Sequence, residues 1–480
     1  MQQREQIVAS AGDYVDSGSF QADLGRIVSY PSESSTPEGR VALKSYLDEM
    51  VEPALASLGC SVERYDSWKG GNNSFLLATR EEDPALPTVL CYGHADVVDG
   101  QAEAWTNGRG PWVLRDEGDR WYGRGSADNK GQHWINIVAL RLLLDQRGSL
   151  GFNLVFLLEG AEEIGSPDLA DFAREHRDAL RADVFIGSDG PRLAAGSPTV
   201  FLGARGGVTF HLTADLRSSS YHSGNWGGLL RNPATTVAAA VASLVDGHGI
   251  IKLPELLPAG IPDSVAAALE FIDVVPNPGD PASDPTWGDS SLSPAERLYA
   301  WNTLEVLALG AGNPAKPVNA IPGSARATLQ LRFVPGTDTA NLESAVRRHL
   351  DAAGFGMVEV QVGSSFAASR LDPDSPWVAW ALASLAKTTG RSPVLLPNIG
   401  GSLPSYVFSD VLGLPTLWVP HSHPGCQQHA PDEHLLKSVA REGLQIAAGL
   451  FFDLATVASP ADSPAGGTAR GAAVSASSVS

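Results

Sequence analysis

Short apolar runs separated by helix-like segments fill the first two hundred residues of the chain. Three runs are typical of buried strands, at 88–92, 153–158 and 184–187, because each is short, apolar and followed by polar or turn-forming residues. Apolar residues at helical spacing predict helices between them, over 132–147 and 167–180. The alternation of strands and helices favours an α/β domain with parallel strands.

The pattern changes after about residue 203. The segment 206–215 alternates between apolar and polar residues, as a half-exposed strand does, and a helix is predicted over about 232–245. A further strand is predicted at 325–333 and a helix at about 339–353. These elements indicate a smaller α+β domain that is inserted into the first domain.

The α/β pattern resumes near Pro373, with a strand at 416–419 and a last helix at about 433–452. A stretch rich in Pro, Gly and Asp at 253–294 is interpreted as a long surface excursion of the inserted domain. The predicted division is a first part of the larger domain over 1–204, the inserted domain over 205–368, a second part of the larger domain over 369–457, and a disordered tail over 458–480.

Composition narrows the range of partners and compartments. The chain has 480 residues and a formal net charge of −20, which argues against nucleic acid or an anionic membrane as a partner. The three cysteines, Cys60, Cys91 and Cys426, are widely spaced, so we expect no disulfide framework and a reducing compartment. We see no signal peptide and no apolar run long enough to cross a membrane, and we therefore expect a soluble, cytoplasmic protein.

Histidine and carboxylate residues follow the ends of the three predicted strands. His94 and Asp96 come after the first strand, the pair Glu162 and Glu163 after the second, and Asp189 after the third. Ligands of parallel α/β sheets bind beyond the carboxyl ends of the strands, so these side chains can share one site. Histidine together with carboxylate suits zinc or another borderline divalent ion, and a carboxylate shared by two ions makes a two-metal site.

Five motifs in chain order resemble the dizinc exopeptidase family that includes carnosinase, carboxypeptidase G and succinyl-diaminopimelate desuccinylase. The motifs lie at 93–98, 123–131, 159–166, 188–189 and 429–433. Each motif is weak alone, because a lone Glu-Glu pair is usually a solvated surface, but five in order make a specific match. The resemblance implies an α/β zinc-exopeptidase catalytic domain with an inserted α+β lid domain that also mediates dimerisation. It is closest to the dipeptidase branch of the family.

The resemblance assigns metal ligands residue by residue. His94 and Asp189 would hold one ion, Glu163 and His429 the other, and Asp128 would bridge both. His429 is selected among four clustered histidines only by the family pattern of the residues that follow it. The peptide bond after Asp128 is cis in the family. The family often has Asp where this chain has Asn129, a position that is not a ligand.

The resemblance also assigns the proton chemistry. Asp96 would hold the ring of His94 through its second nitrogen. Glu162 would be the general base that takes a proton from a water between the metals and passes it to the leaving amine. The implied cofactors are two divalent metal ions, with Zn²⁺ favoured and Mn²⁺ or Co²⁺ also suited to these ligands.

Residues of the inserted domain are similar to those that hold the substrate in the dipeptidase branch. The motif at 221–228 implies that His222 enters the active site of a partner subunit and stabilises the oxyanion, so a homodimer is expected. Arg332 and the loop residues Gly401 and Ser402 would grip a substrate carboxylate, and Asn319 would be another polar contact. In the alternative without a substrate-binding role, His222 is a packed or surface histidine and Arg332 is a surface residue.

The sequence therefore predicts a metal-dependent hydrolase that cleaves the amide bond of dipeptides or small peptides with a free carboxylate. The main alternative is an amidohydrolase that acts on N-acyl amino acids or aryl amides. A second alternative is a non-catalytic metal-binding protein on the same fold, which would require the loss of the base or of a ligand, and all of these residues are present. The excursion at 253–294 and Trp226 are the features expected to adapt the pocket to an unusual substrate.

Overall fold

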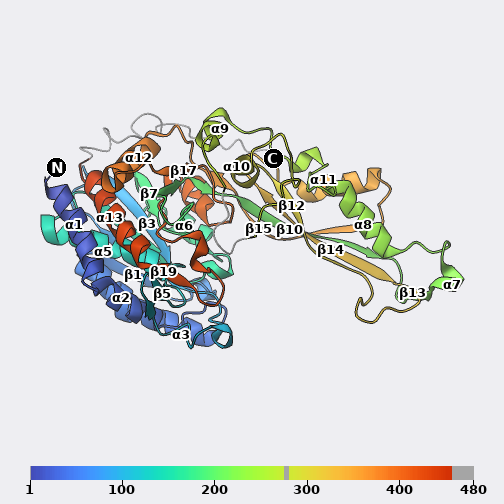
Figure 1. Ribbon diagram of the computed structural model, residues 1–480, viewed down its shortest axis with the longest axis horizontal. Helices are drawn as coiled ribbons and strands as arrows, with labels where there is room; N and C mark the ends of the chain where they lie inside the picture. The colour runs from blue at the N-terminus through green and yellow to red at the C-terminus, as the bar shows by residue number, and fades with distance from the viewer. Residues whose placement is uncertain (1, 275–280, 457–480) are drawn as a thin grey trace, which may run out of the picture. The chain divides into compact units, whose positions relative to one another are not determined.

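The computed structural model describes residues 2–274 and 281–456 of the chain (Figure 1). Its contacts divide the chain into two units. Unit 1 contains residues 1–200, 374–394 and 411 onward, and unit 2 contains residues 201–373 and 395–410. The predicted disordered tail at 458–480 lies outside the described residues.

Unit 1 is built on an eight-stranded sheet whose centre is parallel. The strand order is β1-β2-β6-β3-β7-β18-β8-β17. β3 pairs in parallel with β6 on one side and with β7 on the other, and β7 pairs in parallel with β18. β1 and β2 extend one edge in the antiparallel sense. The bounds are β1 Ser61–Tyr65, β2 Phe75–Arg80, β3 Thr88–His94, β6 Asn153–Glu159, β7 Val184–Gly187, β8 Thr199–Phe201, β17 Val394–Leu396 and β18 Thr416–Trp418.

Helices of unit 1 pack on one another through α13, which contacts α1, α5 and α12 (Figure 1). Their side chains are largely apolar where they meet, and β3 and β6 are buried along nearly their whole length. Strands covered on both faces are expected to be continuous apolar runs, which is the pattern seen in the sequence. The bounds are α1 Gln2–Asp16, α2 Ser19–Val28, α3 Pro37–Tyr46, α4 Glu52–Ser57, α5 Lys130–Arg147, α6 Leu169–Glu175, α12 Pro376–Thr389 and α13 Lys437–Leu454.

Unit 2 has a four-stranded antiparallel sheet in the order β12-β14-β10-β15. Alternate residues such as Phe210, Leu329 and Leu331 face a buried core, which they share with helices α8 and α11. The residues between them, among them Arg332, project from the opposite face of the sheet. The bounds are β10 Gly206–Asp215, β12 Thr303–Gly310, β14 Ser324–Phe333, β15 Glu359–Phe366, α8 Pro233–Leu244 and α11 Leu342–Ala352.

The observed units differ in detail from the predicted domain bounds. The first unit ends at residue 200 instead of 204, and residues 395–410 group with unit 2 although they were predicted to belong to the larger domain. The reason for the second difference is local bonding. The Ile399 backbone N–H donates to the Gly203 carbonyl, and the Arg205 side chain donates to the Gly400 carbonyl.

Strands β12 and β15 were not predicted, whereas the elements predicted at 206–215, 232–245, 325–333 and 339–353 are present as β10, α8, β14 and α11. The excursion contains two short helices, α9 (Asp263–Leu269) and α10 (Pro294–Tyr299). None of the helices in the described residues has the length and apolar character needed to cross a membrane. Cys60, Cys91 and Cys426 are all free.

Candidate metal centre

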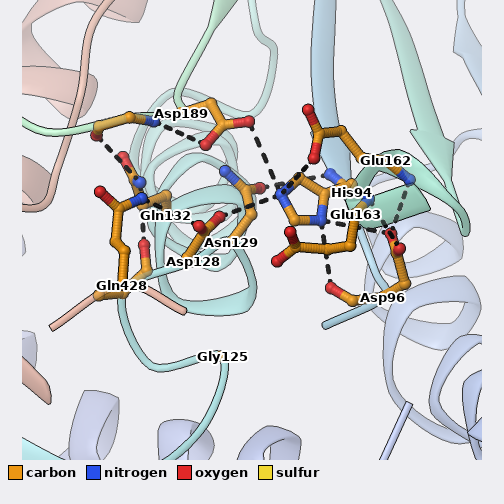
Figure 2. Close-up of polar contacts among 12 residues, drawn as sticks. His94, Asp96, Gly125, Asp128, Asn129, Gln132, Glu162, Glu163, Asp189 and Gln428 are labelled. Carbon is orange, nitrogen blue, oxygen red and sulfur yellow. Dashed lines mark hydrogen bonds and ion pairs between the residues drawn. The ribbon is translucent and has the colours of Figure 1, made fainter. Parts of the chain in front are cut away.

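The carboxyl ends of three neighbouring strands bring the predicted site residues together in unit 1 (Figure 2). His94 is the last residue of β3, Glu162 and Glu163 form the turn after β6, and Asp189 follows β7. Because β3 lies between β6 and β7 and runs parallel to both, the three ends meet at one edge of the sheet. Asp128 reaches the same place from the residue pair that precedes α5.

Asp128 lies between the two histidines and presents one oxygen to each. Its Oδ1 is 3.1 Å from His94 Nε2, and its Oδ2 is 3.1 Å from His429 Nε2. Glu163 Oε2 lies 3.1 Å from His429 Nε2, and Asp189 Oδ2 lies 3.7 Å from His94 Nε2. The structure therefore arranges these five side chains as two groups that share the carboxylate of Asp128.

Asp96 fixes both the histidine and the glutamate turn. The Nδ1 atom of His94 lies 3.1 Å from the Asp96 carbonyl oxygen and 3.3 Å from Asp96 Oδ1. The two oxygens of the Asp96 carboxylate accept hydrogen bonds from the backbone N–H groups of Glu162 and Glu163, each at 3.1 Å (Figure 2). One buried carboxylate thus orients both His94 and the turn of the two glutamates. The contact with His94 was predicted, whereas the contact with the glutamate turn was not.

Asn129 joins two of the strand ends beneath the site. Its Oδ1 accepts from the backbone N–H of His94 at 3.3 Å, and its Nδ2 donates to the Ser188 carbonyl at 2.7 Å. The peptide bond between Asp128 and Asn129 is cis, as the resemblance implied. The amide is well suited to this position, because a carboxylate could not donate to the Ser188 carbonyl.

Two further residues that sequence reasoning did not assign also contact the Asp128 segment. Gln428 Nε2 donates to Asp128 Oδ2 at 2.9 Å (Figure 2). The buried carboxylate of Glu433 accepts from the backbone N–H groups of Ala127 and Asp128, at 2.9 and 3.1 Å. Gly125 N–H and the Arg124 guanidinium also donate to it. Glu433 stood inside the motif at 429–433, but its role depends on contacts more than three hundred residues away in sequence.

The loop that carries His429 has an unusual backbone. Gln427, His429 and Asp432 have φ values of 60°, 59° and 63°, a left-handed conformation that side-chain-bearing residues rarely adopt. Such conformations persist only where surrounding contacts fix them, and they occur often at functional sites. The bonds from Glu433 to the Asp128 segment supply part of that constraint.

Buried negative charge dominates the electrostatics of the site. Burial raises the pKa of Glu162 well above its usual range, and Asp189 adds to the effect although His94 opposes it. Burial raises the pKa of Glu163 to about 7, with a contribution from Asp128. Burial likewise raises the pKa of Asp189 to about 6. Each of these carboxylates would be stabilised in its charged form by a nearby cation.

The histidines respond in the opposite sense. Hydrogen bonds to Asp128 and Glu163 raise the pKa of His429 to about 11. Burial alone would lower the pKa of His94, but Asp128 and Asp96 raise it well above its usual range. Burial also opposes the charge of Asp128, yet contacts with His429 and His94 hold the pKa of Asp128 below its usual value. Two imidazoles thus serve as counter-charges for a larger group of carboxylates.

The donor set fits a divalent metal. The ligand atoms of His94, Asp128 and Glu163 all lie within 4.8 Å of one another. Glu163 Oε1 and Asp189 Oδ2 are buried and lack a hydrogen-bond partner among the described residues. Unpaired buried carboxylate oxygens beside imidazole nitrogens are what a zinc-type ion requires as ligands, whereas they are costly without a cation.

Unit 2 holds a separate cluster that contains three of the predicted substrate residues. Arg332 Nη1 donates to Ser402 Oγ at 2.7 Å, and Ser402 Oγ donates to the Arg205 carbonyl at 2.9 Å. Gly401 is the exposed neighbour of Ser402. Burial and the adjacent charge of Arg332 together lower the pKa of the Arg205 guanidinium to about 10. Two guanidinium groups beside a hydroxyl form a cluster suited to a carboxylate.

His222 and Asn319 lie together elsewhere in unit 2. His222 pairs with Ala320 between the short strands β11 (Tyr221–His222) and β13 (Ala320–Ile321), and the Asn319 carbonyl accepts from the backbone N–H of Ser223. Both side chains are exposed. They lie beyond the Ser324 end of β14, whereas Arg332 is near its other end. At the rise per residue of an extended strand, roughly 25 Å separates the two groups. Figure 1 shows β13 beyond one end of β14. Within one subunit, Asn319 is therefore not next to Arg332.

Comparisons with known proteins agree with the motifs. The model of peptidase family M20/M25/M40 matches residues 90–453. The chain is 26% identical over 475 residues to the Beta-Ala-His dipeptidase of Rattus norvegicus, and the alignment covers 93% of this chain and 95% of the relative. It is 27% identical over 400 residues to the cysteinylglycine-S-conjugate dipeptidase of Corynebacterium striatum, and the alignment covers 80% of this chain and 83% of the relative.

Solved structures show the same fold. The dipeptidase Dug1p of Saccharomyces cerevisiae matches with a TM-score of 0.75 and 21% identity, over 93% of this chain and 98% of that chain. Human carnosine dipeptidase 1 matches with a TM-score of 0.72 and 23% identity, over 94% of this chain and 99% of that chain. The predicted family resemblance, the predicted α/β fold with an inserted α+β domain and the predicted dipeptidase-like class of enzyme are confirmed.

The double role of Asp96 can be tested through metal affinity. In Asp96→Asn, the amide NH₂ group would face a backbone N–H of the glutamate turn, so one hydrogen bond is lost and His94 is held less firmly. We expect zinc affinity to fall about 10–100-fold, measured by competition with a chromogenic chelator. Asp99→Asn, which changes an exposed aspartate close by, is the matched control. An unchanged zinc affinity in Asp96→Asn would contradict this role.

Proposed function

The chain belongs to peptidase family M20/M25/M40, and on that premise we propose that it hydrolyses the amide bond of dipeptides that carry a free carboxylate. The observation that carries the proposal is the position of Asp128, whose two oxygens each contact one histidine beside the buried side chain of Glu163. The relatives named above are dipeptidases of Beta-Ala-His and of cysteinylglycine conjugates. We extend dipeptide hydrolysis from them to this chain.

Two divalent ions, preferably Zn²⁺, are the proposed cofactors. His94 and Asp189 would hold the first ion and His429 and Glu163 the second, with Asp128 as the shared ligand. The bound ions would polarise the scissile carbonyl and lower the pKa of the attacking water. The two unpaired buried oxygens of Glu163 and Asp189 support this assignment.

Glu162 is the proposed general base. Its side chain is partly exposed, at 16%, and Oε2 lies 4.0 Å from His94 Nε2, so it borders the ligand group without occupying a place between Asp128 and either histidine. The Glu162 carboxylate would accept the proton of the attacking water and return it to the nitrogen of the leaving amine. The backbone N–H of Glu162 donates a hydrogen bond to Asp96 Oδ1. This bond fixes the backbone position from which the Glu162 side chain extends.

Arg332, Ser402 and Gly401 are the proposed clamp for the substrate carboxylate. A guanidinium can pair with both oxygens of a carboxylate, and the Ser402 hydroxyl is already within hydrogen-bond distance of Arg332. The clamp belongs to unit 2, so we propose that unit 2 acts as the lid that delivers the substrate to the metal-binding residues of unit 1. Remote binding of this kind positions the scissile bond for attack.

We propose further that the protein is a homodimer in which His222 acts in the site of the partner subunit. β12 is an edge strand of the unit 2 sheet, and its residues Val306, Leu307 and Leu309 are 41%, 56% and 54% exposed. An exposed apolar edge strand is a natural surface for pairing with a second copy. The separation between His222 and Arg332 along β14 supports action in trans.

The assignment of the base can be tested with a panel of dipeptides and N-acyl amino acids. We expect dipeptide hydrolysis that is lost after treatment with a chelator and restored by Zn²⁺. Glu162→Gln should lower kcat by about 10³-fold because the proton acceptor is gone, while its bound zinc, measured by elemental analysis, stays at the wild-type level. The exposed Glu103→Gln is the control. Turnover that stays near the wild-type rate after metal removal or in Glu162→Gln would contradict the mechanism, and cleavage of N-acyl amino acids alone would contradict the substrate.

Action of His222 in trans can be tested by mixing two inactive variants. A heterodimer of His222→Ala and Glu162→Gln has one site with both an intact base and a partner histidine. After subunit exchange at equal concentrations, about a quarter of wild-type activity should return. If His222 acted in its own subunit, both sites of the heterodimer would be defective and no activity would return.

A further inference from the structure

The excursion that precedes β12 forms part of an open apolar cavity of about 380 Å³ within unit 2. This volume lies within the range of about 300–1,000 Å³ that is common for small-molecule sites. Its lining includes Ile251, Leu257, Trp287, Leu298 and Trp301. The excursion, which was expected to adapt the pocket to its substrate, therefore helps to form an apolar site in unit 2.

The cavity and the carboxylate clamp lie side by side on one face of the unit 2 sheet. Thr303 and Glu305 line the cavity, and in the β12–β14 pairing they stand directly opposite Arg332 and Gln330. Side chains opposite each other on antiparallel strands project from the same face, with Cβ atoms about 4.5–5.5 Å apart. Gln330 Oε1 also accepts from Arg332 Nε at 3.0 Å.

Leu298 links the cavity to the clamp from the other side. It lies on α10 and lines the cavity, and its Cδ1 atom would be 3.3 Å from a Cβ atom placed on Gly400. The Gly400 carbonyl accepts from the Arg205 side chain, and Ser402 follows two residues later. The cavity therefore meets the clamp both at β12 and at the loop that carries Ser402.

Charge in the lining indicates what the cavity would reject. Asp284, Asp289 and Glu305 line it together with one arginine, Arg297, whose side chain donates to the Trp287 carbonyl. The acidic residues outnumber the basic one, so a second carboxylate on the ligand would be repelled. The two tryptophans offer aromatic faces that favour an apolar or aromatic group.

We propose that this cavity receives the side chain of the substrate residue that carries the free carboxylate, and that it selects bulky apolar or aromatic side chains. The proposal rests on the proposed function, because it assumes that the clamp holds that carboxylate. A side chain begins one carbon away from its carboxylate, so it must enter a space directly beside the clamp. The cavity is such a space, and a glycine in this position of the substrate would leave it unfilled.

The selectivity can be measured as kcat/KM for Ala-Gly, Ala-Leu, Ala-Phe and Ala-Glu. The wild-type protein should prefer Ala-Phe and Ala-Leu over Ala-Gly by at least about 10-fold, and Ala-Glu should be the poorest of the side-chain-bearing substrates. Trp287→Ala and Leu298→Ala should each lower kcat/KM for Ala-Phe by about 10-fold and change Ala-Gly by less than about 3-fold. Trp287 is 47% exposed, so its removal leaves the apolar core of unit 2 intact.

Phe271→Ala is the matched control, because Phe271 belongs to the same excursion, is 86% exposed and does not line the cavity. It should keep the wild-type preference, and thermal unfolding should confirm that all three variants are folded. Equal turnover of Ala-Gly and Ala-Phe by the wild-type protein would overturn this proposal alone, as would variants that lower both substrates equally. Failure to hydrolyse any dipeptide would instead overturn the proposed function, on which the proposal rests.

Discussion

The structure depends above all on buried negative charge at the carboxyl ends of the central strands of the unit 1 sheet. Asp128, Glu162, Glu163 and Asp189 converge there with two histidines, and burial raises the pKa of three of the four carboxylates. A cluster of this kind is stable in its charged form only with cations among the carboxylates. A metal centre is therefore the condition under which this arrangement makes physical sense, and the residues around it hold the ligands where a cation needs them.

Two other buried carboxylates around the site accept hydrogen bonds from backbone N–H groups. Asp96 binds the turn of the two glutamates, and Glu433 binds the segment that ends in Asp128. Both carboxylates are buried and fully engaged, so they position ligands without competing for the metal. Glu433 also joins the loop of His429 to the segment of Asp128, which couples the second ligand group to the shared ligand.

Much of this could be predicted from sequence because the information is local. Apolar runs marked the central strands, and His94, Glu162, Glu163 and Asp189 stood directly after them. The roles of Glu433 and Gln428 could not be predicted in this way, because they depend on contacts between segments about three hundred residues apart. The same holds for the left-handed φ of His429, which no single residue type signals.

The inserted unit was predicted less completely. Strands β12 and β15 were missed since β12 follows the long excursion and both are exposed along much of their length, which weakens the apolar alternation. Asn319 was predicted only as a polar substrate contact, and the antiparallel path of β14 places it with His222 at the end of the strand opposite Arg332. The cavity beside Arg332 depends on how the excursion folds back on β12, and only the three-dimensional structure reveals it.

A crystal structure of the zinc-loaded protein, with anomalous scattering recorded on both sides of the zinc absorption edge, would test the two-metal centre directly. We expect two zinc peaks that share Asp128 as a ligand, one held also by His94 and Asp189 and the other by His429 and Glu163. A single peak, or zinc bound away from these residues, would contradict the claim that the buried carboxylates form a two-metal centre.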